Sequence, residues 1–111
     1  MTYDSNISSI MMALGDPTRR AVVERLADQP MAVGQIADTL PVSRPAVSQH
    51  LKVLGDAGLV TATQSGTRRI YALNPSAIAS LRDWCDHLWG DALSAFQSEA
   101  ARIAAEKDTS K

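Results

Sequence analysis

A run of polar and basic side chains surrounds a helix-like apolar repeat in the middle of the chain. Val47, Leu51 and Leu54 are spaced i, i+4, i+7, which is typical of the buried face of a helix. With that face turned inward, the outward positions are Arg44, Pro45, Ser48, Gln49 and Lys52. Glutamine pairs bidentately with adenine and arginine with guanine, while serine and lysine also suit phosphates. The pattern therefore indicates a helix that reads base pairs in the major groove of double-stranded DNA.

A second basic group follows at the tip of an expected hairpin, where Gly66 and Thr67 precede Arg68 and Arg69. Two guanidiniums at such a tip suit flanking phosphates or a narrow minor groove. No acidic residue lies in the stretches 43–55 and 57–74, which cover the helix and the hairpin. The alternative for each group alone is a merely solvated surface. His50, beside the apolar stripe, is either a packing residue or a phosphate contact.

The charge of the chain is unevenly distributed. The 111 residues carry a formal net charge of −1, with 11 basic and 12 acidic residues, which excludes a polybasic protein that binds nucleic acid by bulk attraction. Residues 17–71 nevertheless hold seven basic residues against four acidic ones, whereas the segments on both sides are acidic. The expected DNA-binding face thus lies in the basic centre of a weakly acidic chain.

The elements that must position these side chains follow from caps, breakers and periodicity. Asp16-Pro17 and Asn74-Pro75 are helix starts, Ser43 is placed to cap the central helix, and Gly58 ends it in a left-handed conformation. The expected elements are a short helix ending at Gly15, helices 17–27, 33–40, 44–57 and 75–106, and strands 59–64 and 68–73 joined by a turn at 65–67. Helix, turn, helix and hairpin in this order predict a mainly α fold with a β-hairpin wing, the winged helix-turn-helix arrangement.

Apolar residues on the first and last helices exceed what one small core can cover. We expect them to form a symmetric dimer interface, which would set two reading helices about 34–36 Å apart, one DNA turn. The alternative is that the stripe packs on its own domain. The expected interface residues are Ile7, Ile10, Met11, Leu81, Trp84, Cys85, Leu88, Trp89, Ala92 and Phe96. The predicted organisation is one domain at 1–107, with dimerisation helices at 1–15 and 75–107, a DNA-binding core at 16–74 and a polar tail at 108–111.

Four segments resemble the ArsR (SmtB-like) family of winged-helix repressors. They are Ala13–Arg20, Val42–Leu54, Ala57–Val60 and Gly66–Leu73, within a resemblance that spans about Ile10 to Phe96. The resemblance implies a homodimeric bacterial transcription factor, usually a repressor, which binds an imperfect palindrome near its own operon. It also implies that Arg44, Ser48 and Gln49 read bases, that Ser43, His50 and Lys52 contact the DNA backbone, and that Arg68 and Arg69 belong to the wing. With these, the DNA-binding candidates are Ser43, Arg44, Pro45, Ala46, Ser48, Gln49, His50, Lys52, Gly66, Thr67, Arg68 and Arg69.

The inducer sites of that family are not matched. Residues 34–40 lack the Cys-x-Cys pattern of its thiolate sensors, and the last helix lacks the several histidines of its zinc sensors. We therefore expect the branch without a recognised metal site and no cofactor, with the inducer unknown. Two minor alternatives remain: a metal ion on Cys85, His87 and Asp91, and a redox-responsive repressor in which two Cys85 thiols form an intersubunit disulfide.

Other classes of function have less support in the sequence. A winged-helix module that binds proteins instead of DNA suits the net charge, but it leaves Arg44, Lys52, Arg68 and Arg69 without a role. An enzyme is not expected, because the chain has two histidines, no glycine-rich phosphate loop and no nucleophile motif. No run of 18 apolar residues and no basic signal start occur, so we expect a cytoplasmic protein without a membrane partner.

Overall fold

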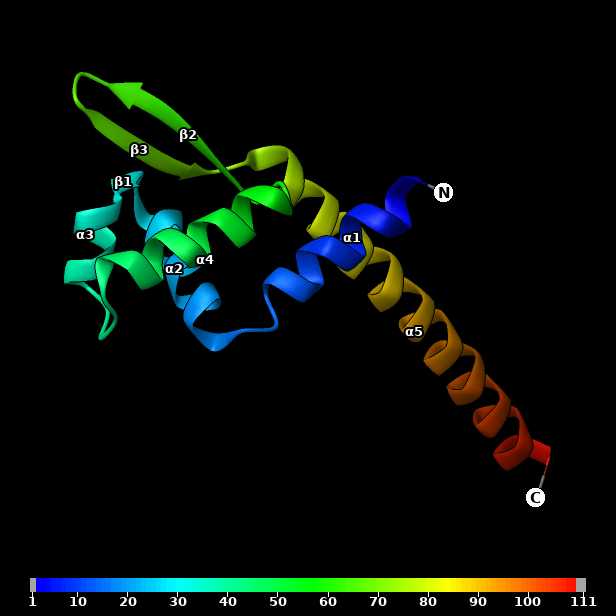
Figure 1. The fold of residues 1–111 in the computed structure, drawn as a ribbon. Coiled ribbons are helices and arrows are strands. Elements are labelled where there is room, and N and C mark those ends of the chain that lie inside the picture. Colours follow the sequence, from blue (N-terminus) through cyan, green and yellow to red (C-terminus); the bar gives the residue numbers. More distant parts are fainter. Residues whose placement is uncertain (1, 110–111) are drawn as a thin grey trace. The chain divides into compact units, whose positions relative to one another are not determined.

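The computed structural model confirms the predicted fold class, a mainly helical chain with a small antiparallel sheet (Figure 1). It describes the backbone of residues 2–109 and the side chains of residues 7–107. The helices are α1 (Thr2–Ala13), α2 (Pro17–Asp28), α3 (Val33–Asp38), α4 (Arg44–Asp56) and α5 (Pro75–Thr109), and the strands are β1 (Met31–Ala32), β2 (Val60–Ser65) and β3 (Arg68–Leu73). The chain divides into two compact units, Met1–Leu81 and Arg82–Lys111, with the boundary inside α5.

The sheet has three strands in the order β1-β3-β2, not the two strands that the sequence predicted. Met31 and Ala32 of β1 pair antiparallel with Tyr71 and Ile70 of β3. A two-residue strand is too short to show an alternating pattern, so its existence depends on this pairing alone. The hairpin turn is also tighter than expected, since Ser65 pairs with Arg68 and only residues 66–67 remain as the loop. Gly66 has φ +64°, which hairpin loops of two residues require.

The predicted helix caps are confirmed. The Asp16 carboxylate accepts hydrogen bonds from the N–H groups of Thr18 (2.8 Å) and Arg19 (3.0 Å). Ser43 Oγ accepts one from Ala46 N–H at 3.3 Å, at the start of α4. Gly58 has φ +78° just after the end of that helix, as expected for a left-handed stop. These local bonds fix where the central helix begins and ends.

Asn74 both starts α5 and holds the base of the hairpin. Its side-chain oxygen accepts a hydrogen bond from Ser76 N–H at 3.1 Å, and its side-chain nitrogen donates one to the Gly58 carbonyl at 2.9 Å. Its own N–H donates to the Leu59 carbonyl at 2.8 Å. One residue thus ties the end of β3 to the segment that follows α4, and this fixes the hairpin against that helix.

Two arginines of α2 join that helix to α1. Arg19 Nε donates to the Ala13 carbonyl at 2.6 Å, and an Arg20 guanidinium nitrogen donates to the Leu14 carbonyl at 2.7 Å. The last carbonyls of a helix have no partner within it, and cations there also suit the helix dipole. At this joint, Asp16 therefore accepts hydrogen bonds from the free N–H groups at the start of α2, and the two arginines donate to the free carbonyls at the end of α1.

The core of the Met1–Leu81 unit is built from the apolar faces of its helices and the base of the hairpin. Its fully buried side chains are Ile10, Val22, Ile36, Val47, Leu51, Leu54 and Leu59. Val47, Leu51 and Leu54 confirm the predicted inward stripe of α4. This stripe fixes the rotation of α4 about its axis, and the opposite face is left exposed.

Some helix ends differ from the expectation. The third helix ends at Asp38 instead of Leu40, and Thr39 Oγ1 donates to the Ile36 carbonyl at 2.8 Å there. The last helix continues to Thr109, so the first half of the expected polar tail is helical. Ser110 and Lys111, the rest of that tail, lie outside the described residues.

Candidate nucleic-acid interface

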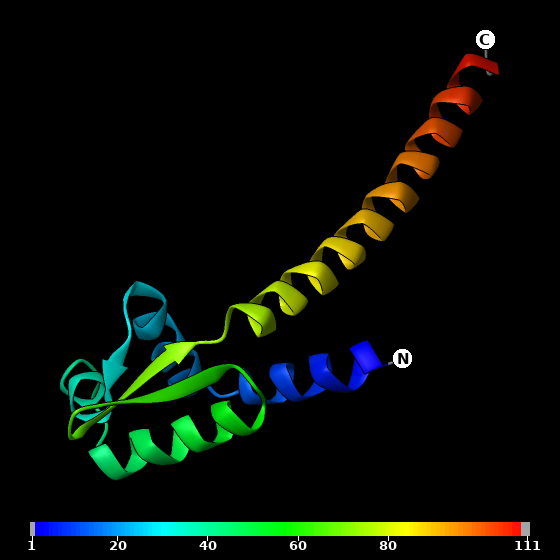
Figure 2. The same cartoon turned by 90° about the horizontal axis from the view of Figure 1, so that it is seen from above.

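The outer face of α4 presents the side chains that the sequence predicted to be outward. Arg44, Pro45, Ser48, Gln49 and Lys52 are all exposed. Turns of a helix repeat every 3.6 residues, so these positions share the surface opposite the buried stripe. In Figure 2, α4 and the β2–β3 hairpin lie side by side in the Met1–Leu81 unit. The predicted reading helix and the predicted wing are therefore neighbours.

The other DNA-binding candidates near the start and middle of α4 have side chains that are less exposed or already hydrogen-bonded. Ser43 is exposed but its hydroxyl is engaged in the cap, and Ala46 is half-buried. His50 is half-buried as well. The pKa of Asp16 is lowered mainly by the hydrogen bond that its carboxylate accepts from the N–H of Arg19, and nearby His50 makes the smallest contribution. His50 thus lies toward the α1–α2 joint.

Arg44 lies against the backbone of α3. A Cβ atom added to Gly34 would stand 3.1 Å from an Nη atom and 3.2 Å from Cζ of the Arg44 guanidinium. The missing side chain at Gly34 therefore leaves room for the guanidinium at the start of α4. No pattern in the sequence signals this contact, because Gly34 lies inside an expected helix that is separate from the helix of Arg44.

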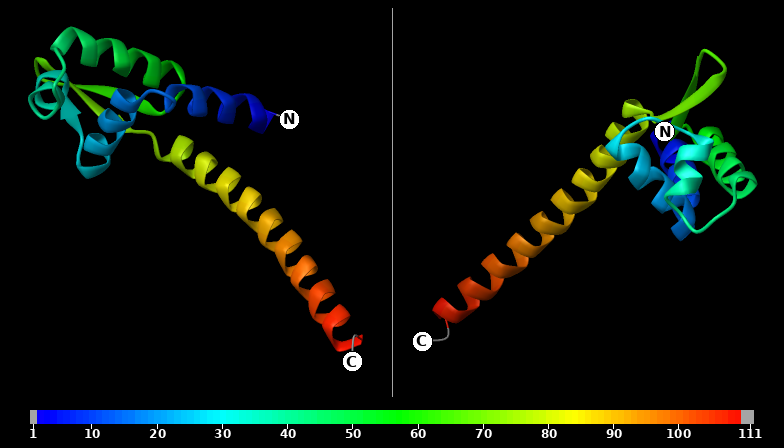
Figure 3. Two further views of the ribbon diagram at one scale, coloured as in Figure 1. Left: turned by 90° about the horizontal axis from the view of Figure 1, so that it is seen from below. Right: turned by 90° about the vertical axis from the view of Figure 1, so that its left-hand side faces the viewer.

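The wing carries the second basic group. Gly66, Thr67, Arg68 and Arg69 are all exposed, and the hairpin extends past the helices of its unit with its turn at the outer end (Figure 3). Successive residues of a strand point to opposite faces, so Arg68 and Arg69 lie on opposite sides of the hairpin. The Arg69 guanidinium carbon lies 5.7 Å from the centre of the Tyr71 ring, within the range of a cation–π contact.

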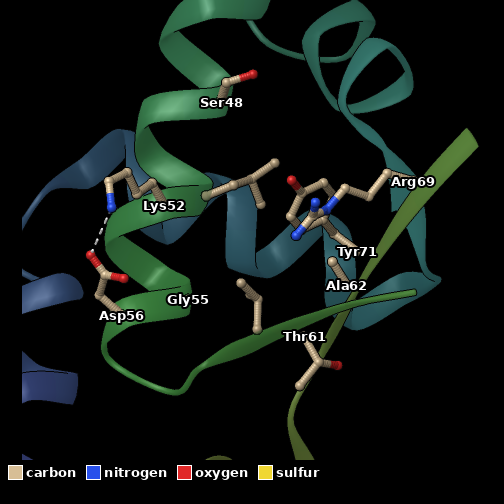
Figure 4. Close-up of a pocket in the computed structure, with 10 residues that line it drawn as sticks. Ser48, Lys52, Gly55, Asp56, Thr61, Ala62, Arg69 and Tyr71 are labelled. Carbon is tan, nitrogen blue, oxygen red and sulfur yellow. Dashed lines mark hydrogen bonds and ion pairs between the residues drawn. The ribbon is translucent and has the colours of Figure 1, made fainter. Parts of the chain in front are cut away.

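A cleft of about 360 Å³ lies between α4 and the hairpin, and we call it the α4–wing cleft (Figure 4). Its polar lining comes from Ser48, Lys52 and Asp56 of α4, from Thr61 of β2, and from Arg69 and Tyr71 of β3. Lys52 Nζ lies 3.5 Å from a carboxylate oxygen of Asp56, in an exposed i,i+4 pair. Sequence reasoning missed Tyr71 as a member of this site, although its i+2 spacing from Arg69 was a signal for a shared face.

The expected dimer residues fall into two groups. Ile7 and Ile10 are 3% and 0% exposed in the single chain, so they pack in the core of the Met1–Leu81 unit. Their role in a dimer stays a prediction, and Met12, which is 77% exposed, presents free apolar surface on α1 together with Met11. Apolar spacing alone cannot separate a core face from an interface face, because both remove the same side chains from water.

Most of the interface residues expected on the last helix are exposed in the single chain. Leu88, Trp89 and Phe96 are 55%, 66% and 70% exposed, and Cys85 and Ala92 are exposed too. Leu81 and Trp84 are half-buried. Side chains at i, i+3 and i+4 share one helix face, so the Arg82–Lys111 unit presents a continuous apolar stripe to solvent. An exposed apolar stripe of this kind is typical of a protein–protein contact.

The described part of the chain contains no cluster of potential metal ligands and no membrane-spanning helix. Among the side chains of residues 7–107, no three from His, Cys, Asp or Glu come together closely enough to hold a metal ion. His87 Nδ1 lies 3.1 Å from the Asp83 carbonyl, and Cys85 is a free, exposed thiol. None of the described helices is both long enough and apolar enough to span a bilayer.

Comparison with known proteins gives matches over the same segments. The family model described as bacterial regulatory protein, arsR family, matches residues 16–62, which include α2, α3 and α4. HTH-type transcriptional regulator Rv2034 of Mycobacterium tuberculosis is 58% identical over 84 residues, which are 76% of this chain and 78% of that protein. Transcriptional repressor SdpR of Bacillus subtilis is 30% identical over 78 residues, 70% of this chain and 87% of that repressor.

A solved structure extends the likeness to the whole winged-helix arrangement. It is the solution structure of a homodimeric winged helix-turn-helix DNA-binding domain from Mycobacterium bovis, a possible ArsR-family transcriptional regulator. The TM-score is 0.65 at 25% sequence identity, over 82% of this chain and 84% of that one. The elements that form the site described above thus occur together in a structure whose DNA-binding domain is a homodimer.

Proposed function

Since this chain belongs to the ArsR family of bacterial DNA-binding transcriptional regulators, we propose that it is a homodimeric repressor of its own operon. In this proposal it binds an imperfect palindrome in double-stranded DNA, with helix 44–57 in the major groove and wing 60–73 on the flanking DNA. A regulator of this kind acts on the bacterial chromosome, in the cytoplasm. The similarity to a protein named as a transcriptional repressor supports the direction of regulation.

The observation that carries the proposal is the exposed polar face of α4 beside the wing. Arg44, Ser48 and Gln49 are exposed there, and these residue types read base edges. No carboxylate lies in the stretch 43–55, so nothing in α4 up to that point repels phosphate. Lys52 and the wing arginines supply positive charge for the DNA backbone on both sides of the reading residues.

The dimer is supported by the apolar stripe of the Arg82–Lys111 unit. Trp89 and Phe96 are large, are mostly exposed in the single chain, and lie two helical turns apart. Aromatic side chains of this kind are enriched at the centres of protein interfaces. A twofold dimer would present two α4 helices, and a palindromic operator would match that symmetry.

The test is a binding titration with a duplex from the region upstream of the protein's own gene and a shuffled duplex of the same length and composition. We expect tight, salt-sensitive binding to the first and weak binding to the second. Gln49→Ala should weaken operator binding and relax its sequence preference, because a bidentate base contact contributes about 1–3 kcal/mol of discrimination. Gln29→Ala, the same exchange at an exposed position outside helix 44–57 and wing 60–73, is the matched control.

Two results would contradict the proposal. Equal losses on the operator and the shuffled duplex would remove the base-reading role of Gln49. Equal affinity of the unmodified protein for both duplexes would favour the alternative, a winged-helix module that binds another protein.

A further inference from the structure

We propose that the α4–wing cleft receives one phosphate of the DNA backbone, and that Tyr71 is a positioning residue that holds the Arg69 guanidinium toward that phosphate. The inference rests on the proposed function, because it assigns one contact within the proposed DNA complex. It assigns different roles to Arg68 and Arg69, which the sequence alone does not distinguish.

The register of the hairpin places Arg69 and Tyr71 on the side of the sheet that faces α4. Arg69 pairs with Gln64 and Tyr71 pairs with Ala62 across the two strands. Residues i and i+2 of a strand share a face, so the stacked pair lines the cleft while Arg68 points to the other side. Figure 4 shows the Arg69 guanidinium beside the Tyr71 ring, across the cleft from α4.

The charges of the cleft favour an anion. Among the described residues, Asp56 is its one acidic lining group, and Lys52 is paired with it at 3.5 Å. Arg69 has no carboxylate partner in that same part of the chain, and its recorded side-chain contact is the uncharged ring of Tyr71. A cation–π contact orients a guanidinium without neutralising its charge, so the N–H groups of Arg69 remain available to phosphate oxygens.

The dimensions and the other lining groups fit a backbone phosphate. The cleft of about 360 Å³ corresponds to the liquid volume of ~12 water molecules, which accommodates a phosphate with its neighbouring sugar and water. Ser48 lies on the α4 wall and its hydroxyl can donate to a phosphate oxygen. The cleft adjoins the reading face of α4, so a DNA strand that lies along this helix passes its mouth.

The first test compares single variants for affinity to the upstream duplex over a range of salt concentrations. Arg69→Gln should reduce the slope of log K against log salt by about 1.8, which is about 0.9 for the one phosphate in each half-site of the dimer's operator. Tyr71→Leu should raise Kd about two- to five-fold for each subunit of the dimer, the effect of one exposed cation–π contact, and Tyr71→Phe should restore wild-type affinity because the ring is kept. Arg68→Gln removes the same charge from the other face of the hairpin, so any loss that it causes measures the effect of wing charge without a change in the α4–wing cleft.

The second test asks whether Tyr71 acts through Arg69. In the Arg69→Gln background, Tyr71→Leu should have no further effect on Kd, whereas in the Arg68→Gln background its effect should persist. A merely structural tyrosine would weaken binding equally in both backgrounds. Melting temperatures of all variants show whether Tyr71→Leu perturbs the fold.

Phosphate ethylation interference provides a readout that does not depend on any change at Tyr71. One ethylated phosphate per half-site should interfere with binding of the wild type and of Arg68→Gln but not of Arg69→Gln. An identical interference pattern for Arg69→Gln and the wild type would overturn the inference, and so would additive effects of Tyr71→Leu and Arg69→Gln. These failures differ from failure of the proposed function, in which the wild type itself would not prefer the upstream duplex.

Discussion

Replacement of Gly34 by alanine should keep or raise the stability of the fold and weaken DNA binding. The added Cβ would stand 3.1 Å from an Arg44 Nη atom and 3.2 Å from Cζ, whereas ordinary van der Waals contacts of such an atom begin at 3.4 Å. The guanidinium must therefore move by a few tenths of an ångström. It is the far end of a flexible, exposed side chain, so this movement costs little.

The stability effect follows from the position of Gly34 inside α3. Alanine is favoured over glycine in a helix interior by up to about 1 kcal/mol, because it loses less backbone freedom on folding. We expect the free energy of unfolding to stay the same or to rise by as much as ~1 kcal/mol. Urea denaturation followed by circular dichroism measures this change.

The affinity for DNA should fall, although the stability of the fold is kept or raised. A bidentate contact of arginine with guanine is worth about 1–3 kcal/mol, and a small displacement of Arg44 should cost the lower part of that range, about five-fold in affinity for each half-site. The loss should be largest for the base pair that Arg44 reads, and competition with single-base-pair variants of the operator identifies it. In an Arg44→Gln background, Gly34→Ala should cause no further loss. Destabilisation by more than ~1 kcal/mol, or an equal loss in that background, would refute the reasoning.

Three further predictions concern the cap of α4, the α1–α2 joint and the dimer. Ser43→Ala should lower the free energy of unfolding by about 1 kcal/mol, whereas Ser43→Asp should keep stability in urea denaturation and still weaken DNA binding by its charge. The pKa of Asp16 is lowered from its ordinary 3.8 by the hydrogen bond from Arg19 N–H, so its ionised form should stabilise the fold above about pH 4 and lose that effect as pH falls through the lower folded value. Asp16→Asn should flatten this acid limb in melting curves recorded against pH. Phe96→Ser should give a monomer by sedimentation equilibrium at micromolar concentration, with the melting of the single chain retained, because Phe96 is 70% exposed in it; a persistent dimer would contradict the proposed interface.

The elements that depend on local chemistry were predictable from the sequence. Asp16, Ser43 and Asn74 each stand before a helix, and each uses its side chain as expected. The inward stripe of α4 followed from the 3.6-residue period, and the exposure of its polar face followed from the stripe. Caps and periodicity act within a few residues, so one sequence contains all the information that they need.

The features that depend on distant partners were not predictable in this way. The strand β1 exists because Met31 and Ala32 pair with the edge of β3. A segment of two residues is too short to contain a pattern that predicts this pairing. Gly34 matters because Arg44 folds back across α3, and Tyr71 matters because the hairpin lies beside α4. Each contact joins segments whose approach is decided by packing of the whole unit.

The net charge of −1 does not describe the charge of the DNA-binding face, which depends on where the charged side chains lie in the fold. Lys52 is paired with Asp56, so the cation of the α4–wing cleft without a carboxylate partner is Arg69 among the residues that the structure describes. Attraction to any DNA should then depend on few phosphate contacts in each half-site, and the slope of log K against log salt should correspond to those contacts, with about 0.9 for each phosphate. Discrimination between operator and random DNA must in that case come mainly from the base-reading residues of α4. A measured slope that corresponds to many neutralised phosphates would show instead that additional cations, outside α4 and the wing, engage the DNA.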